Sequence, residues 1–401
     1  MQYEVVVVGA GPAGSTAARF LAEKGVSVLL LDKERFPRFK PCGGGLPLRV
    51  LQDFPYVKDM ESVESYSYGG IVHSPSLKYT IEVQKPEPII GMVSREHFDH
   101  ALLRIAQDHG ADVQQGFEVT KVHVATDGVT ITLKDGRSIT TPVVIGADGY
   151  ASTVARTTGL FHRQDWIGTS IVEEFPVSPD MIKELYSEKK SFHLYMKFNG
   201  LAGYGWVFPK ESTVNIGLGQ YQRRGKGHII KKNLRQHFAT YLSHLKREQV
   251  LPPELESSHP RGGMLPVAPL DKTYMDRVLL CGDAAGFINP ITGEGIYYAM
   301  ASGSMVAKTV LEASIEEDYS EHILKRYQKL WNHAFGRDIA LLESSTGRWG
   351  NRDEKIMRLM KYDSTLTELF FQMLSGQSSF YDLRWKIILR YLYASIRYGR
   401  R

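Results

Sequence analysis

Three glycines near the start of the chain, Gly9, Gly11 and Gly14, have the spacing of a loop that binds phosphates. In such a loop the first glycine permits a tight turn, the second lets the backbone approach a pyrophosphate, and the third lets a helix pack close to a strand. Asp32 follows at the end of the next apolar run, where a carboxylate can accept hydrogen bonds from ribose hydroxyls. The spacing alone is weak evidence, but strand, loop, helix, strand and acid occur here in the required order. The sequence therefore predicts a dinucleotide site.

A second glycine-containing segment favours FAD over NAD as that dinucleotide. Residues 277–286 form an apolar strand that ends in a Gly-Asp pair and small residues. Asp283 at this strand end can bind a ribityl chain. Gly293, Gly295 and Ile296 then open a helix whose N–H groups can face the pyrimidine oxygen of a flavin. A purely structural turn would not explain glycines at both ends of so short a segment.

Two further motifs could do chemistry or hold an apolar ligand. Residues 40–46 place Cys42 in a glycine-rich, basic loop, where a thiol can lie beside a reactive ligand. Alternatively, Cys42 is a small buried residue that only packs in the core. Tyr204, Trp206 and Phe208 alternate with smaller residues, so on a strand their rings share one face. Such a face can wall an apolar cavity and stabilise positive charge, whereas an ordinary sheet core would need no ligand.

With these motifs the chain resembles the flavoprotein superfamily of aromatic hydroxylases and, within it, the geranylgeranyl reductase family. The superfamily signals are the glycine motif at 9–14, Gly-Ala-Asp-Gly at 146–149 and Gly-Asp at 282–283. The narrower resemblance rests on the Cys-Gly loop, on Tyr-x-Trp-x-Phe-Pro at 204–209 and on Asn-Pro-Ile-Thr-Gly-Glu-Gly-Ile at 289–296. It extends from residue 1 to about residue 335, and the helical tail beyond is less diagnostic.

The resemblance implies that FAD is the cofactor and that Cys42 lies beside its isoalloxazine ring. It also implies that Tyr204, Trp206 and Phe208 line the substrate cavity. Asp32 stands where many relatives carry glutamate, and its shorter side chain can still reach a ribose. Together with the motif residues above, the implied FAD contacts are Gly9, Gly11, Ala13, Gly14, Asp32, Lys33, Cys42, Gly43, Gly45, Arg95, Val119, Asp283, Gly293, Gly295 and Ile296.

The activity that the resemblance implies is saturation of isolated double bonds in a geranylgeranyl or other polyprenyl chain, with hydride from flavin N5. An isolated alkene has no carbonyl to accept charge, so the reaction needs a dry, apolar cavity and an acid. Cys42, Tyr204 and bound water all remain candidates for that acid, and the electron donor is NADPH or ferredoxin. One alternative is a flavin monooxygenase or halogenase, although halogenases carry Trp-x-Trp-x-Ile-Pro where this chain has Tyr204 and Phe208. Another is a non-enzymatic prenyl-binding protein, a class that tends to lose the flavin motifs kept here.

The order of patterns predicts a mixed α/β (α+β) fold that positions these residues. We expect a discontinuous Rossmann-like FAD-binding domain, an inserted antiparallel-sheet substrate domain and a helical C-terminal region. The predicted boundaries are 1–65, 90–160 and 265–335 for the first, 66–89 and 161–264 for the second, and 336–401 for the third.

Composition sets the broad class and the compartment. With 43% hydrophobic and 23% charged residues, the chain has the composition of a globular protein. Its net charge of +5 is too small to predict a nucleic-acid partner. Two cysteines do not make a disulfide framework, and no metal site is predicted. A start without a cationic leader predicts a cytoplasmic location, and no apolar run is long enough for a transmembrane helix.

The C-terminal segment 384–401 predicts peripheral membrane contact. Its apolar residues recur at helical spacing on one face. It carries six basic residues and no acidic residue after Asp382, a pattern typical of a helix that lies on an anionic membrane. A helix packed on its own domain is the alternative. The apolar residues of this face are Trp385, Ile388, Leu389, Leu392 and Ile396.

Overall fold

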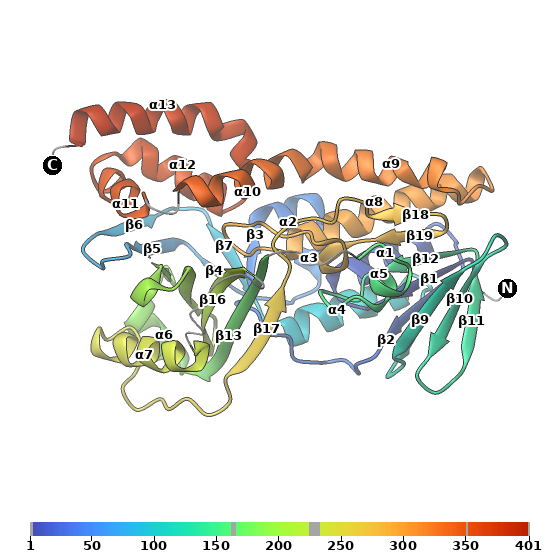
Figure 1. Ribbon diagram of the computed structural model, residues 1–401. Coiled ribbons are helices and arrows are strands. Elements are labelled where there is room, and N and C mark those ends of the chain that lie inside the picture. Colours follow the sequence, from blue (N-terminus) through green and yellow to red (C-terminus); the bar gives the residue numbers. More distant parts are fainter. Residues whose placement is uncertain (1–2, 162–165, 224–232, 350–351, 400–401) are drawn as a thin grey trace. The chain divides into compact units, whose positions relative to one another are not determined.

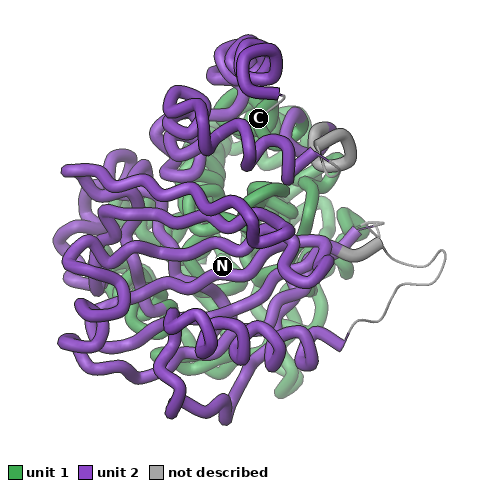
Figure 2. Tube along the Cα trace, turned by 90° about the vertical axis from the view of Figure 1, so that its left-hand side faces the viewer, with its two compact units in different colours: residues 1–39, 95–164, 265–340 green, residues 40–94, 165–264, 341–401 purple. Residues whose placement is uncertain are grey.

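The computed structural model describes residues 3–161, 166–223, 233–349 and 352–399. Its chain divides into two compact units, coloured separately in Figure 2. Unit 1 comprises 1–39, 95–164 and 265–340, and unit 2 comprises 40–94, 165–264 and 341–401. Within the described residues, no helix is both long and apolar enough to cross a membrane.

Unit 1 is built on a six-stranded sheet with the order β18-β19-β12-β1-β2-β8 (Figure 1). Its pairs are parallel except at the edge, where β18 and β19 are antiparallel. The β-branched run of β1 is buried on both faces, as a central parallel strand requires. The strands are β1 (Val5–Val8), β2 (Val28–Asp32), β8 (Asp112–Gln115), β12 (Val143–Gly146), β18 (Tyr274–Met275) and β19 (Val278–Leu280).

A smaller antiparallel sheet and several helices complete unit 1. The sheet has the order β11-β10-β9, with β9 (Val119–Val124), β10 (Val129–Leu133) and β11 (Ser138–Thr141). The helices are α1 (Pro12–Ala22), α4 (Arg95–Asp108), α5 (Thr153–Thr157), α8 (Ile296–Ile315) and α9 (Glu321–Trp331), and α10 (Arg337–Trp349) continues from unit 1 into unit 2.

Unit 2 is built on a seven-stranded sheet with the order β17-β13-β16-β15-β14-β5-β6. Neighbours from β13 to β14 pair antiparallel, whereas β14 and β5 run parallel. Its strands are β5 (Gly69–His73), β6 (Thr80–Gln84), β13 (Trp166–Pro176), β14 (Phe192–Met196), β15 (Gly203–Pro209), β16 (Thr213–Arg223) and β17 (Arg261–Leu265). A three-stranded sheet adds β3 (Gly45–Pro47), β4 (Val63–Ser67) and β7 (Ile90–Val93). The helices are α2 (Leu48–Asp53), α3 (Tyr56–Asp59), α6 (Pro179–Tyr186), α7 (Leu234–Arg247), α11 (Asp353–Tyr362), α12 (Ser364–Leu374) and α13 (Phe380–Tyr398).

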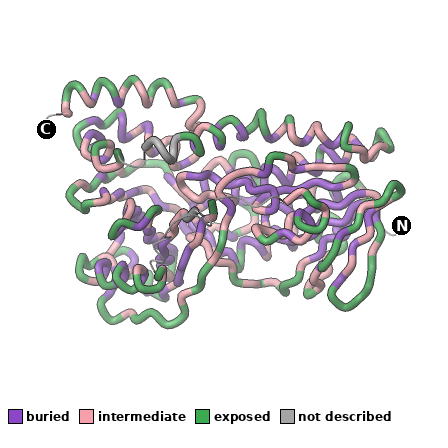
Figure 3. The backbone as a smooth tube through the Cα atoms, in the orientation of Figure 1, coloured by how far each residue is buried: buried purple, intermediate pink, exposed green. Residues whose placement is uncertain are grey.

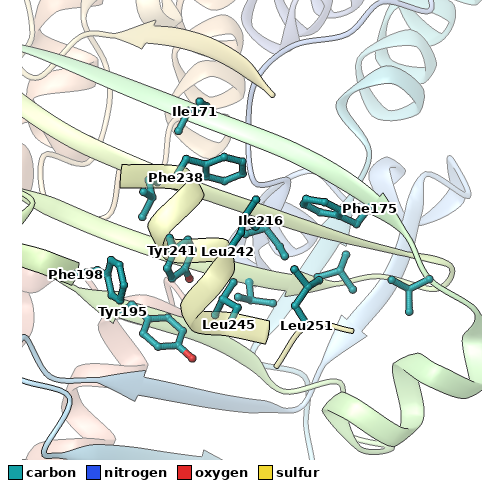
Figure 4. Close-up of a cluster of buried hydrophobic side chains, with 14 of the residues drawn as sticks. Ile171, Phe175, Tyr195, Phe198, Ile216, Phe238, Tyr241, Leu242, Leu245 and Leu251 are labelled. Carbon is teal, nitrogen blue, oxygen red and sulfur yellow. The ribbon is translucent and has the colours of Figure 1, made fainter. Parts of the chain in front are cut away.

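The two faces of the large sheet bury different cores, because successive strand residues point to opposite sides. On one face, strand side chains such as Val207 and Ile216 pack with residues of α6 and α7, among them Tyr241 of α7 (Figure 4). On the other, Trp206 packs in a cluster with residues of α11, α12 and α13, among them Phe371. The aromatic residues of β15 therefore share their face with the C-terminal helices.

The sequence prediction of a mixed α/β fold with parallel and antiparallel sheets and C-terminal helices is confirmed. The compact units differ in detail from the predicted domain boundaries. Residues 40–65 and 341–401 fall in unit 2, since β3 and β4 pair with β7 and the last helices pack on the large sheet.

Candidate functional site

The first and third glycines of the N-terminal motif are required by the protein's own packing. Gly9 has a φ of +101°, and a Cβ there would lie 2.4 Å from the carbonyl oxygen of Ala147. A Cβ at Gly14 would lie 1.8 Å from the carbonyl oxygen of Gly9. Both contacts are too close for any side chain, so the tight β1–α1 turn needs glycine at each position.

Gly11 differs, because nothing in the protein crowds it. It is the N-cap of α1, and the nearest atom to a Cβ built there is Nη2 of Arg38, at 3.8 Å. The N–H groups at the start of α1 are therefore approachable at this point. Open space over a glycine at a helix N-terminus fits the close passage of a pyrophosphate, which is the role assigned to the second glycine of the motif.

A group of two arginines and one carboxylate stands beside this helix start. Asp99 is completely buried and receives hydrogen bonds from Nε and Nη2 of Arg95, each at 2.8 Å. Nη2 of Arg38 lies 2.7 Å from the same carboxylate. The group carries an excess positive charge, and Nη1 of Arg38 is buried without a hydrogen-bond partner in the protein. An unsatisfied buried guanidinium nitrogen is costly unless a ligand accepts from it, so the group fits an anion.

The sequence predicted Arg95 as a contact of FAD but did not single out Asp99. In the structure Arg95 is only 8% exposed and holds Asp99 across one turn of α4. The spacing of the two residues, four positions apart on a predicted helix, was the available signal.

Asp32 is held in a fixed orientation at the end of β2. Its carboxylate accepts hydrogen bonds from the backbone N–H groups of Ala10, at 2.7 Å, and Glu34, at 2.8 Å. Lys33 lies next to it and is exposed. Val119 is buried as the first residue of β9, where it pairs with Leu133. The carboxylate is thus placed at the carboxyl end of a parallel strand, where this fold binds ribose.

The second predicted segment lies against the first in unit 1. Gly303 of α8 is so close to α1 that a Cβ there would lie 2.4 Å from the carbonyl oxygen of Ala13. Asp283 occupies the short helical turn Gly282–Ala285, and its Oδ1 would be 3.6 Å from a Cβ on Gly295, the N-cap of α8. Gly293 has a φ of +68°, a backbone conformation that favours glycine at this position. The carboxylate of Asp283 therefore lies beside the N-terminus of α8, the second helix start in the predicted site.

In unit 2 the Cys-Gly loop packs on the aromatic face of β15. A Cβ on Gly43 would lie 2.8 Å from the ring of Phe208 and 2.9 Å from Nε1 of Trp206. The ring centroids of Tyr204 and Trp206 are 5.9 Å apart, and those of Trp206 and Phe208 are 6.4 Å apart. The three rings form one continuous face, with Trp206 buried and the other two half-buried.

A hydrogen-bonded network joins this loop to the sheet. Nε1 of Trp206 donates to Oδ1 of Asn215 at 2.8 Å, and Nδ2 of Asn215 donates to the carbonyl of Cys42 at 3.1 Å. The Asn215 amide also donates to Glu174, at 2.6 Å, and Glu174 forms an ion pair of 2.9 Å with the buried amine of Lys210. The loop is therefore fixed by buried polar contacts as well as by packing.

Sequence reasoning missed this network and one glycine that makes room for it. Asn215 is the single polar residue in the stretch 214–219 of β16, which was the one available signal. A Cβ on Gly217 would lie 2.1 Å from the indole of Trp206, so the ring can cross β16 only over a glycine.

The two cysteines have different surroundings. Cys42 is a free, half-buried cysteine whose Sγ accepts a hydrogen bond from the N–H of Gly44 at 3.4 Å. The φ of +75° at Gly44 and its close approach to the carbonyl of Val93 define the turn that follows. Cys281 is completely buried, and burial raises the pKa of its thiol. A thiol in such surroundings stays protonated and unreactive.

Comparison with known proteins relates the chain to flavoenzymes. A family model described as an FAD binding domain matches residues 2–337. A digeranylgeranylglycerophospholipid reductase of Methanocaldococcus jannaschii is 32% identical over 338 residues, 82% of each chain. A chloroplastic geranylgeranyl diphosphate reductase of Nicotiana tabacum is 31% identical over 84% of this chain and 73% of its own.

Solved structures agree with the fold. A geranylgeranyl bacteriochlorophyll reductase-like protein of Thermoplasma acidophilum superposes with a TM-score of 0.78 and 26% identity, over 95% of this chain and 98% of that one. Flavin-dependent halogenase structures also match, one of them in complex with FAD at a TM-score of 0.69. Their identity of 19 to 22% shows a shared fold alone.

Proposed function

Because the chain belongs to the geranylgeranyl reductase family of FAD-dependent oxidoreductases, we propose that it saturates isolated carbon–carbon double bonds of a polyprenyl chain. The substrate class follows from the relatives, whose names specify a geranylgeranylated phospholipid in one case and geranylgeranyl diphosphate in the other. The observation that carries the proposal in this chain is the continuous face of three aromatic rings against the Cys42 loop.

The residues of unit 1 suit the cofactor, which is FAD. We propose that Gly11, Arg38 and the start of α1 receive the pyrophosphate, that Asp32 receives the ribose, and that Asp283 and the N-terminus of α8 receive the flavin half. When bound and reduced, FAD supplies a hydride. The buried guanidinium and the open glycine are features of the chain itself, and they need an anionic ligand to complete their contacts.

The aromatic face suits a substrate without polar groups near the reacting bond. A double bond with no adjacent carbonyl develops positive charge when it is protonated, and aromatic faces stabilise such charge by roughly 0.5–2 kcal/mol. Tyr204, Trp206 and Phe208 also exclude water, which would otherwise capture that charge. We propose Cys42 and Tyr204 as the catalytic candidates, because each side chain carries an acidic proton, Tyr204 is one of the three rings, and Cys42 precedes Gly43 in the loop against them; bound water is the third source of the proton.

Two variants distinguish these proton sources. Tyr204→Phe removes the hydroxyl and keeps the ring, and Cys42→Ala removes the thiol without enlarging the loop. Loss of product with only one of them assigns the proton to that residue, and full activity in both assigns it to water. The FAD content of each variant serves as the control for cofactor binding.

The reaction class is tested by anaerobic incubation of the dithionite-reduced enzyme with geranylgeranyl diphosphate and, separately, with a geranylgeranylated phospholipid. We expect mass gains in steps of two hydrogens in at least one product, and none with the oxidised enzyme. NADPH and reduced ferredoxin then replace dithionite to identify the electron donor. Substrate-stimulated oxygen consumption on an aromatic compound, with no prenyl reduction, would favour a monooxygenase instead.

A further inference from the structure

The C-terminal helix α13 has a buried side and an exposed apolar side. Leu383, Tyr391 and Ala394 are at most 9% exposed, and Tyr391 and Ala394 belong to the core on the face of the large sheet. The opposite side carries a stripe of large apolar residues at intervals of four, three and four positions, which align along one helix face. The stripe consists of Trp385, Leu389, Leu392 and Ile396, which are 62%, 65%, 52% and 87% exposed.

This stripe is a concentration of exposed apolar surface, not a scatter of single residues. Among the described residues, five of the eleven exposed large hydrophobic side chains lie on α13, Tyr393 being the fifth. Figure 3 shows mostly exposed and intermediate residues along this helix. Single exposed hydrophobic residues are common, but a contiguous exposed stripe marks an interaction surface.

Basic side chains border the stripe on both sides. Lys386 and Arg397 lie on one side and are exposed, and Arg384 lies on the other with its guanidinium over the rings of Tyr381 and Trp385. Arg390 is turned away toward Asp363, at 2.8 Å. Arg400 and Arg401 lie outside the described residues.

No acidic residue offsets these charges on the helix beyond its first turn. The sequence from residue 383 to the end contains neither Asp nor Glu. At the N-terminus of α13 the carboxylate of Asp382 accepts a hydrogen bond from the hydroxyl of Ser379, and the backbone N–H of Asp382 donates to that hydroxyl oxygen. The surface around the stripe is therefore positive, and its complement is an apolar phase covered by negative charge.

We propose that α13 docks the protein on an anionic lipid surface, with the stripe inserted at the acyl boundary and Lys386, Arg397 and Arg384 at the headgroup phosphates. A basic helix with an exposed apolar face binds membranes in this way and lies in the interface plane. A second copy of the chain is a poor partner, because a symmetric contact along α13 would bring the basic side chains that border the stripe close to those of the other copy. The proposal does not depend on which reaction the protein catalyses.

The test compares two equally exposed isoleucines in the full-length protein. Ile396 of the stripe is 87% exposed, and Ile315 at the end of α8 is 84% exposed. The probes are vesicles of phosphatidylcholine alone and of equal parts phosphatidylcholine and phosphatidylglycerol, with binding measured by co-sedimentation. We expect the wild type and Ile315→Ser to bind the anionic vesicles equally, Ile396→Ser to bind them several-fold more weakly, and Trp385→Ser/Ile396→Ser to bind them about tenfold or more weakly.

A second pair of variants tests the charge. Lys386→Glu/Arg397→Glu is expected to lower binding to the anionic vesicles by roughly tenfold or more and to leave the weak binding to phosphatidylcholine unchanged. High salt should release the wild type in the same way. Substitutions at exposed positions are preferred to deletion of α13, because deletion would also remove Tyr391 and Ala394 from the core.

Three results would overturn the proposal. The first is a wild type that does not bind anionic vesicles, and the second is binding that the stripe and charge variants leave intact. The third is a self-association of the wild type, seen by sedimentation velocity, that the stripe variant abolishes, since that would assign the face to a second copy. Circular dichroism of each variant checks that the helix is retained.

Discussion

Trp206 donates an indole hydrogen bond of 2.8 Å to the side-chain oxygen of Asn215, and both residues are buried. The same asparagine donates to the carbonyl of Cys42 at 3.1 Å. A residue of β16 thus fixes both the ring at the centre of the aromatic face and the loop that carries the cysteine. This relationship makes the geometry of the candidate site depend on a residue that need not touch the substrate.

Replacing Asn215 by Ala leaves the buried indole N–H and the Cys42 carbonyl without this partner. The expected cost is about 1–3 kcal/mol of unfolding free energy, measured by urea denaturation. Trp206→Phe removes the indole N–H that donates to Asn215. A double-mutant cycle with both changes should show a coupling of about 0.5–3 kcal/mol. Additive effects would contradict the importance of this contact.

A methyl group on Gly43 should impair prenyl reduction, and the FAD content of the variant is measured alongside its activity. In Gly43→Ala the new carbon would meet Phe208 at 2.8 Å and Trp206 at 2.9 Å, so the loop or the rings must shift. We expect a loss of kcat/KM of roughly tenfold or more, since misplacement near a reacting centre is costly. Gly262→Ala is the matched control, because its Cβ would meet only the carbonyl of Ser170 at an ordinary 3.5 Å. Equal activity of the two variants would argue against the aromatic face as the substrate site.

Substitutions of the glycines in the N-terminal motif should show which glycine is needed for FAD binding and which is needed for folding. Gly11→Ala places its methyl group in open space, so the apoprotein should unfold at nearly the wild-type urea concentration but bind FAD at least tenfold more weakly. Gly14→Ala clashes with Gly9 and should destabilise the apoprotein itself. Apoproteins are compared because bound FAD would stabilise the wild type by mass action. Normal FAD affinity in Gly11→Ala would show that the pyrophosphate does not pass this glycine.

A histidine pair in the large sheet of unit 2, with His193 buried and His73 half-buried, should make the protein sensitive to mild acid. Nε2 of His73 and Nδ1 of His193 are 3.2 Å apart. Burial lowers the pKa of His73 to about 3 and that of His193 to about 4, from an ordinary value of 6.5. The unfolded chain therefore binds protons that the folded chain does not as the pH falls below about 6.5.

The stability that this pair contributes is complete above pH 6.5 and is lost as the pH falls toward 4. We expect the free energy of unfolding to fall by on the order of 2–4 kcal/mol between pH 7 and pH 5 from this pair. His193→Phe should reduce that fall, and His322→Phe, at an exposed position of α9, should leave it unchanged. An equal pH dependence in all three proteins would contradict these pKa shifts.

The features of the site that require a fixed spacing of residue types could be predicted from the sequence. The three glycines and Asp32 follow from the geometry of a turn that receives phosphates, and the alternation of Tyr204, Trp206 and Phe208 follows from the period of a strand. The exposed stripe of α13 was also readable as a helix face, although only the structure shows that this face is not the one that packs on the sheet.

The remaining features could not be predicted because they depend on long-range pairing. Asn215 and Cys42 are 173 positions apart, and Arg38 reaches Asp99 from a loop with no regular pattern. The pattern of residues along a strand or helix does not show which distant residue a single polar side chain contacts. The division into units likewise depends on β3 and β4 pairing with β7, which no local pattern specifies.

The most direct test of prenyl reduction is a single anaerobic turnover of the FAD-loaded enzyme. The flavin is first reduced and its oxidised absorbance band disappears, and a geranylgeranyl substrate is then added without any other oxidant. We expect the oxidised band to return and one double bond to be saturated for each flavin, as measured by mass spectrometry of the product. A band that stays bleached with every prenyl substrate, and returns only when oxygen is admitted, would contradict prenyl reduction.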